Sequence, residues 1–288
     1  MPACRRTTFS AFFPASLAPA LGRCGALLLM GLWAAAAGAA DIRLGVLAWL
    51  GSEEAEVQWK PLVQELERRL PGHRIQLRQY DLDELSQALQ GGEVEFVVTN
   101  PGHYVALEAE HGISRIATQV SAPSQDPAHV VGSAVVVLER RRDLRRLEDL
   151  RGATLAAVAE DAFGGYQLIW AELLRHGLDP EQGQPRPLFT GFPMPRVVEA
   201  VLRGEAGVLR ACLLERLERE GAVPPGRLRV LSPRADVGHC GVTSALYPGW
   251  AFAAARGTDP ALSRAVLLAL LSLPADEGGQ TWSVPADY

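Results

Sequence analysis

Two stretches of the chain place glycine, hydrogen-bonding and aromatic residues directly after an apolar strand pattern. The first is TNPGHY, from Thr99 to Tyr104, and the second is EDAFGGY, from Glu160 to Tyr166. In open α/β sheets, ligands bind at the carboxyl ends of strands, where the N–H groups of helix N-termini point outward. Both stretches therefore predict backbone that can approach a ligand closely. The first suits a small anion, whereas Glu160 and Asp161 argue against a bare anion beside the second unless they cap its helix and face away. The alternative for both is an ordinary capped helix or a glycine turn.

The first stretch carries side chains suited to an oxyanion. Thr99 and Asn100 can hydrogen-bond to a ligand or cap a helix, and Pro101-Gly102 allows a sharp turn into that helix. His103 and Tyr104 then fall in the first turn of the helix, near the positive end of its dipole. We expect these residues to line a binding cleft.

The second stretch and two further strand-end loops add glycine and aromatic residues. Gly164 and Gly165 would let the backbone come close to a ligand, with Phe163 beside them. Trp49 follows the first strand pattern of the domain, and Phe192 lies in a later strand-end loop. We expect Trp49 and Phe163 to supply apolar walls of the cleft.

The sequence contains no recognisable catalytic or metal-binding motif. The patterns G-x-S-x-G, H-E-x-x-H, C-x-x-C and the P-loop are all absent, and the six histidines show no convincing metal-ligand spacing. We therefore expect no metal, no cofactor and no enzymatic activity. A less favoured alternative is an enzyme in which Cys212 is the nucleophile and His239 its base.

Two of the four cysteines belong to the domain that follows the N-terminal stretch. Cys4 and Cys24 lie near the N-terminus, whereas Cys212 and Cys240 belong to the domain that follows. An even pair in an exported protein is most simply a disulfide, which would here close a loop of about 28 residues and stabilise the fold by about 3 kcal/mol. The alternative is a redox-active pair at the ligand site.

The first 40 residues predict a secretory signal peptide. They contain no Asp or Glu, and Arg5, Arg6 and Arg23 precede an apolar stretch, Gly25 to Ala37, that ends in small residues. A retained membrane anchor is the alternative, but the apolar stretch is shorter than the roughly 20 residues that a spanning helix needs. No second stretch of this kind follows. We therefore expect a periplasmic protein without a membrane span after cleavage.

The remaining 248 residues predict an acidic domain with two lobes. They hold 25 basic and 33 acidic residues, and this net charge of −8 argues against nucleic acid as a partner. Strand and helix patterns alternate and restart after a charged segment at residues 139–151. We expect residues 41–138 and 240–288 to form lobe 1 and residues 139–239 to form lobe 2. Residues 208–219 are expected to be largely helical.

Several motifs resemble the phosphate/phosphite/phosphonate-binding periplasmic protein family. LEDLRG, from Leu147 to Gly152 before a strand pattern, is typical of the second lobe of that family. A narrower resemblance is to the sensory domain of tetrathionate-sensor-type histidine kinases. It rests on the motifs VTNPGHYV, FGG, TGFP and RACLLE, which begin at Val98, Phe163, Thr190 and Arg210.

The resemblance implies an α/β, type II periplasmic-binding-protein fold with two lobes and a hinge cleft. It also implies a sensor input domain that recognises a small anion, by preference a sulfur oxyanion, and signals by lobe closure to a two-component histidine kinase. The alternative is the substrate-binding protein of a phosphate/phosphonate-type ABC importer, whose partner is a permease. The chain has Asp161 to Gly164 where transport-type phosphonate binders carry a hydroxyl-rich turn, which disfavours phosphonate.

This fold and resemblance together give ten residues that we expect to line the cleft. Main-chain amides, Thr99 and His103 would hold the oxyanion. The ten residues are Trp49, Thr99, Asn100, His103, Tyr104, Phe163, Gly164, Gly165, Phe192 and Arg210.

Overall fold

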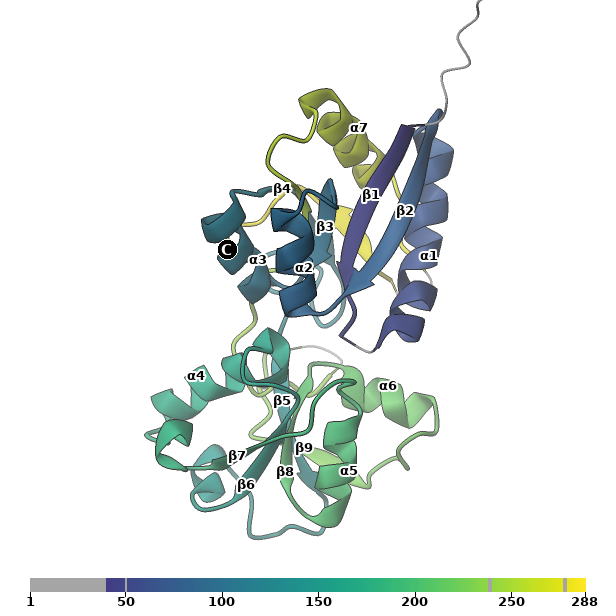
Figure 1. Cartoon of the computed structure of the whole chain (residues 1–288). Coiled ribbons are helices and arrows are strands. Elements are labelled where there is room, and N and C mark those ends of the chain that lie inside the picture. The colour runs from purple at the N-terminus through teal and green to yellow at the C-terminus, as the bar shows by residue number, and fades with distance from the viewer. Residues whose placement is uncertain (1–39, 50, 238–239, 277–278) are drawn as a thin grey trace, which may run out of the picture. The chain divides into compact units, whose positions relative to one another are not determined.

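The computed structural model describes residues 40–49, 51–237, 240–276 and 279–288 (Figure 1). The predicted signal peptide lies outside these ranges except for its last residue, and His239 also lies outside them. The described chain contains two β-sheets. None of its described helices has both the length and the apolar character that crossing a membrane requires.

The first sheet has six strands in the order β11-β4-β10-β3-β1-β2. Strand β1 pairs in parallel with β2 and β3, whereas β10 pairs antiparallel with β3 and β4. The short strand β11 pairs antiparallel with β4. The strands are β1 Ala40–Leu47, β2 His73–Tyr80, β3 Phe96–Thr99, β4 Ser114–Val120, β10 Ala251–Ala254 and β11 Thr281–Ser283.

Four helices pack around this sheet, and side-chain caps begin three of them. Asp81 caps α2, Asn100 caps α3 and Asp259 caps α7, each by accepting a hydrogen bond from a backbone N–H of the first turn. Pro61 lies inside α1 without ending it. The helices are α1 Ser52–Arg69, α2 Leu82–Gln90, α3 Pro101–His111 and α7 Pro260–Leu271, with α1 beside α7 and α2 beside α3.

The second sheet has five strands in the order β7-β6-β8-β5-β9. Strand β6 is parallel to β7 and β8, and β5 is antiparallel to β8 and β9. The strands are β5 Ser133–Leu138, β6 Thr154–Ala157, β7 Arg186–Phe189, β8 Ala206–Arg210 and β9 Leu228–Leu231. The helical segments are η1 Leu147–Leu150, η2 Phe163–Gln167, α4 Leu168–Arg175, η3 Pro180–Gln182, α5 Arg196–Arg203 and α6 Leu213–Arg219.

The pairing of strand β5 differs from the lobe boundaries that the sequence suggests. Ser133 of β5 pairs with Arg210 of β8, so the strand belongs to the second sheet. Thr243 also bonds to this sheet, because its N–H donates to the Ser133 carbonyl at 2.8 Å. Assigned by sheet pairing, the second lobe therefore begins before the boundary expected at residue 139 and ends after the one expected at residue 239.

The segment from residue 208 to residue 219, expected to be largely helical, is a strand followed by a short helix. Strand β8 ends at Arg210, and Cys212 adopts a left-handed φ of 66° before α6 begins at Leu213. A buried strand and a buried helix turn share the same apolar composition, so the sequence pattern alone did not separate them. Arg210 therefore lies at the carboxyl end of a central strand.

The chain crosses between the two sheets twice, first at residues 121–132 before β5 and again at residues 245–250 before β10, and the two crossings are hydrogen-bonded to each other. Val131 and Tyr247 form an antiparallel bridge in which each N–H donates to the carbonyl of the other residue at 2.8 Å. The N–H of Val130 also donates to the Tyr247 carbonyl at 2.7 Å. Two α/β lobes joined by a pair of crossings thus form the frame around the predicted cleft.

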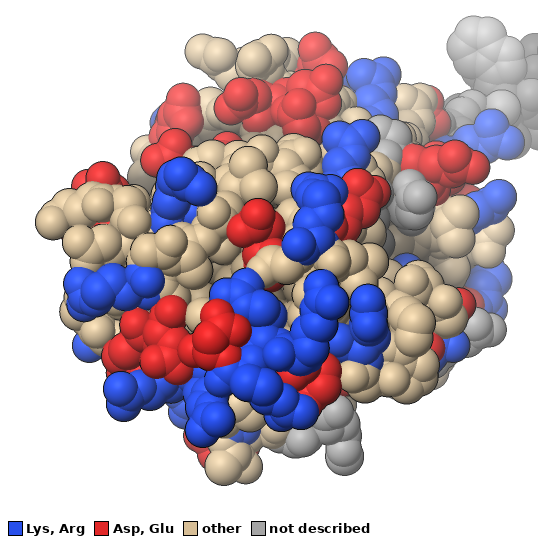
Figure 2. Space-filling view, turned by 90° about the horizontal axis from the view of Figure 1, so that it is seen from below, with Lys and Arg blue, Asp and Glu red and all other residues tan. Residues whose placement is uncertain are grey.

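The end of the second lobe that lies away from the crossings is rich in arginine (Figure 2). Strand β5 runs from the crossings toward this end of the lobe, because its first residue, Ser133, pairs with Arg210 at the end of β8 nearest the crossings. The exposed arginines on and beside the loop that follows β5 are Arg140, Arg142, Arg145, Arg146 and Arg227. Arg142 and Arg146 are ion-paired with nearby carboxylates. Figure 2 shows acidic side chains among these arginines, so this end of the lobe carries mixed charge.

Candidate functional site

A small cavity lies between the two lobes, at the carboxyl ends of β1, β3, β6 and β8. Its volume is about 30 Å³, and it is open to solvent. The structure brings seven of the ten predicted cleft residues together around it. They are Trp49 and Asn100 from the first lobe, and Phe163, Gly164, Gly165, Phe192 and Arg210 from the second.

Thr99, His103 and Tyr104 do not line this cavity. Thr99 is buried, and its Oγ1 lies 2.8 Å from Nδ1 of His103. Burial, followed by the charge of nearby His111, lowers the pKa of His103 to about 4, so this imidazole is neutral at pH 7. Tyr104 is fully buried in the first lobe, where its hydroxyl donates to Glu108 and burial raises its pKa. All three side chains therefore serve the packing of α3.

Arg210 is the only charged side chain among the described residues that line the cavity. Its guanidinium carbon lies 5.3 Å from the centre of the Trp49 ring, which makes a cation–π contact between the two lobes. Burial, and secondly the charge of Arg216, lower the pKa of Arg210 to about 10, so it stays protonated. Arg216 is paired with Glu220, whereas no carboxylate within the described chain pairs with Arg210.

The π-helical turn η2 brings the second lobe against the first. Phe163 begins η2 and lies so close to Gly102 of α3 that a Cβ on Gly102 would be 2.4 Å from Phe163 Cδ2. The Phe163 ring also packs edge-on against Tyr247 of the second crossing, with 5.6 Å between ring centroids. Phe163 therefore contacts the first lobe, a crossing and the cavity at once, and only glycine at position 102 leaves room for it.

The two glycines of η2 have different roles. A Cβ on Gly165 would lie 2.4 Å from Val158 Cγ1, so packing inside the second lobe is enough to require glycine there. Around Gly164 a Cβ would meet only ordinary contacts with Val131 and Arg210. The Gly164 carbonyl accepts a hydrogen bond from Ser133 Oγ at 2.8 Å, which holds the turn against β5.

Six residues that the sequence did not single out also line the cavity, and all six are apolar. Met194 lies in the same strand-end loop as Phe192, and its Sδ accepts the Arg210 N–H at 3.4 Å. Trp250 packs against Trp59 with 6.2 Å between ring centroids. Within the described chain, no group of three or more His, Cys, Asp or Glu residues could hold a metal ion. The six residues are Leu47, Leu82, Val131, Ala162, Met194 and Trp250.

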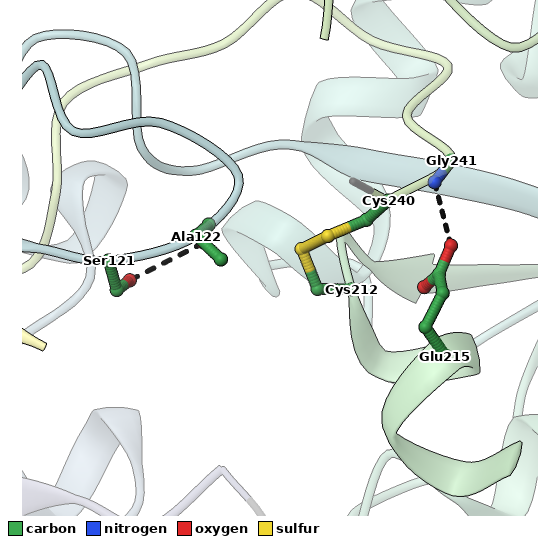
Figure 3. Close-up of a disulfide and its surroundings, with 6 residues drawn as sticks. All are labelled: Ser121, Ala122, Cys212, Glu215, Cys240 and Gly241. Atoms are coloured by element: carbon green, nitrogen blue, oxygen red, sulfur yellow. Dashed lines mark hydrogen bonds between the residues drawn. A yellow bond between two sulfur atoms is a disulfide. The ribbon is translucent and has the colours of Figure 1, made fainter. Parts of the chain in front are cut away.

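Cys212 and Cys240 form a disulfide with 4.9 Å between their Cα atoms (Figure 3). Beside it, Glu215 of α6 accepts a hydrogen bond from the Gly241 N–H at 2.7 Å. These two links fasten the segment that precedes the second crossing to α6. Neither cysteine lines the cavity. A bonded Cys212 is not a free nucleophile, and the base suggested for it, His239, lies outside the described residues.

Comparison with known proteins shows the fold. A family model of the periplasmic substrate-binding protein of phosphonate ABC transporters matches residues 44–286. A binding-protein component of an ABC phosphonate transporter from Pseudomonas aeruginosa superposes with a TM-score of 0.67, at 15% identity over 85% of this chain and 82% of that chain. The PhnD1 protein of Prochlorococcus marinus in complex with methylphosphonate gives 0.65, at 13% identity over 81% and 84%. The predicted two-lobed periplasmic-binding fold is confirmed.

The narrower resemblance predicted from the sequence is also confirmed. The tetrathionate sensor histidine kinase of Salmonella typhimurium is 32% identical over 267 residues, which are 92% of this chain and 45% of that protein. The chain thus spans less than half the length of this relative. Taken together, the lobes, the crossings and these similarities show that the chain belongs to the family of phosphonate-type periplasmic substrate-binding proteins.

Proposed function

We propose that residues 41–288 are a periplasmic sensor input domain that binds a small anion between its lobes without transforming it. The first 40 residues would act as the export signal. Lobe closure around the anion would then be passed to a histidine kinase partner. The similarity to a tetrathionate sensor kinase supports the sensor role.

The charge of Arg210, which no carboxylate of the described residues neutralises, is the observation that carries this proposal. Arg210 is half-buried, and a cation partly withdrawn from water is unfavourable unless an opposite charge joins it. Trp49 stacks on the guanidinium but supplies no negative charge. An anion beside Arg210 would satisfy the guanidinium, and the side-chain amide of Asn100 could add a hydrogen bond from the first lobe.

The walls of the cavity favour a sulfur oxyanion over phosphate or phosphonate. Apart from Asn100 and Arg210, the lining side chains are apolar or glycine. Strongly hydrated anions such as phosphate lose many hydrogen bonds with water on binding and need many donors in return. An anion with a weakly hydrated sulfur body would instead gain from contact with residues such as Trp49 and Met194.

The substrate-binding component of an importer is the second candidate, because the matching family model describes phosphonate transport. The cavity and Arg210 would serve the same purpose there. The two candidates differ in their ligand and in their partner, which is a permease for the importer. Genes for a kinase and response regulator beside this one would favour the sensor, and genes for a permease and ATPase would favour the importer.

A thermal-shift screen of residues 41–288 tests the ligand. The panel is tetrathionate, thiosulfate, sulfate, phosphate and methylphosphonate, with the variants Arg210→Met and Arg216→Met. A ligand at 100 times its dissociation constant should stabilise the parent by about 2.7 kcal/mol. We expect this shift with a sulfur oxyanion, its loss in Arg210→Met, and its retention in Arg216→Met. A shift with methylphosphonate alone would favour the importer, and a shift that survives in Arg210→Met would refute the site.

A further inference from the structure

Tyr288 holds the C-terminal segment, residues 281–288, against the second crossing. Its hydroxyl donates to the Gly249 carbonyl. Its ring packs on Tyr104 with 5.1 Å between centroids, and the Arg115 guanidinium lies over both rings, 4.9 Å from the Tyr288 centroid and 5.3 Å from that of Tyr104. Burial raises the pKa of Tyr288 to about 12, so the hydroxyl remains a donor at neutral pH. The end of this segment lies beside α3 (Figure 1).

The rest of the C-terminal segment is fastened to β4. Strand β11 pairs with β4 in a register that sets Thr281 opposite Val120, the residue at which β4 leads into the first crossing. The N–H of Ala286 donates to Thr118 Oγ1 at 2.9 Å, and its carbonyl accepts from Arg115 at 2.8 Å. The segment therefore bonds to the strand before one crossing and, through Tyr288, to the other crossing itself.

Gly249 has little freedom to move away from these contacts. Its N–H donates to the Pro127 carbonyl of the first crossing at 2.9 Å. A Cβ on Gly249 would lie 1.7 Å from the Gln119 carbonyl oxygen, so its backbone is pressed against β4. Two residues earlier, Tyr247 receives the edge-on contact of Phe163. A short series of contacts thus runs from Phe163 at the cavity to Tyr288.

We propose that the C-terminal segment reports the position of the lobes and that Tyr288 is the positioning residue that couples it to the crossings. Because Gly249 is held against β4, a rotation of the lobes that turns the second crossing at Tyr247 would strain the bond between the Gly249 carbonyl and the Tyr288 hydroxyl. Coupling of this kind is reciprocal: loosening the segment also changes the crossings. The inference rests on the proposed lobe closure, and it requires no particular ligand.

Hydrogen exchange in the variant Tyr288→Phe tests the coupling from the C-terminal side. The matched control is Tyr80→Phe in the same lobe, because the buried Tyr80 hydroxyl has no hydrogen-bond partner among the described residues. We expect Tyr288→Phe to raise exchange in peptides covering residues 127–133 and 245–251 by about threefold or more, while Tyr80→Phe leaves it unchanged. Equal exchange of these peptides in the two variants would overturn the inference.

The variants Gly102→Ala and Phe163→Ala test the coupling from the cavity side. Both remove the close contact between the lobes, one by a clash and the other by loss of the ring. We expect faster exchange of residues 281–283 in both, although neither substitution touches the C-terminal segment. Changed exchange in residues 160–167 with unchanged exchange in residues 281–283 would overturn the inference. An absence of anion binding in the thermal-shift screen would refute the proposed function alone, since these experiments contain no ligand.

Discussion

Replacing Gly102 by alanine should disfavour closure of the two lobes. The added Cβ would lie 2.4 Å from Cδ2 and 2.9 Å from Cγ of Phe163, whereas carbon atoms in contact are about 3.5–4.0 Å apart. The ring must therefore move by about 1 Å. Tyr247 blocks one direction, because its ring lies edge-on against Phe163. Separation of the lobes relieves the clash without disturbing the interior of either lobe.

The size of the effect follows from where the clash acts. Overpacking typically costs about 1–3 kcal/mol. Gly102 and Phe163 belong to different lobes, so this cost falls on the closed form and spares the folding of each lobe. A free-energy change of about 1–3 kcal/mol lowers the ratio of closed to open protein by about 5- to 150-fold. The apparent Kd of an anion that needs closure should rise by a similar factor.

Calorimetric titration with the anion identified in the thermal-shift screen measures this effect. Gly91→Ala is the matched control, because its Cβ would lie 3.4 Å from the Gln87 carbonyl and far from any contact between lobes. Gly102→Ala should matter much less in a Phe163→Ala background, since the clashing ring is then gone. Unchanged affinity in Gly102→Ala, or an equal loss in both backgrounds, would refute the reasoning.

Two further predictions concern stability. Reduction of the Cys212–Cys240 disulfide should lower the free energy of unfolding by about 3 kcal/mol. Urea unfolding should show a lower midpoint on reduction, and the double variant Cys212→Ser, Cys240→Ser should reproduce it. An unchanged midpoint would count against the bond. Stability should also fall as the pH drops from about 6.5 to about 4, because the unfolded chain binds a proton at His103 in this window while the folded protein, with a pKa of about 4, does not. His103→Gln should flatten that part of the pH profile by about 3 kcal/mol, and an unaltered slope would contradict the assignment.

The sequence predicted the features whose cause is local. Asn100, expected to hydrogen-bond to a ligand or cap a helix, caps α3. A cap depends only on a side chain and the first turn that follows it. Seven of the ten cleft residues also meet around one cavity, because parallel strands bring their carboxyl ends together wherever the strands pair.

Features that depend on distant pairing were not predictable in this way. Strand β5 is apolar enough for either sheet, and its place was decided by pairing with β8 and β9 much later in the chain. Arg210 was suggested by resemblance alone, because the apolar residues before it fit a helix as well as a strand. Tyr104 was placed correctly in the first turn of α3, but its direction depends on packing against Tyr288.

The hydrogen-bonded pair of crossings has a consequence for how different anions would act. Val131 and Tyr247 are bonded to each other, so the crossings form a two-stranded ribbon. If this ribbon twists without its strands sliding apart, movement of the lobes would reduce to one angle. In the proposed sensor, a bound anion would set where the rotation stops. Anions that pair equally well with Arg210 would therefore differ in efficacy, and one that stops the rotation early would act as a partial agonist or a competitive antagonist.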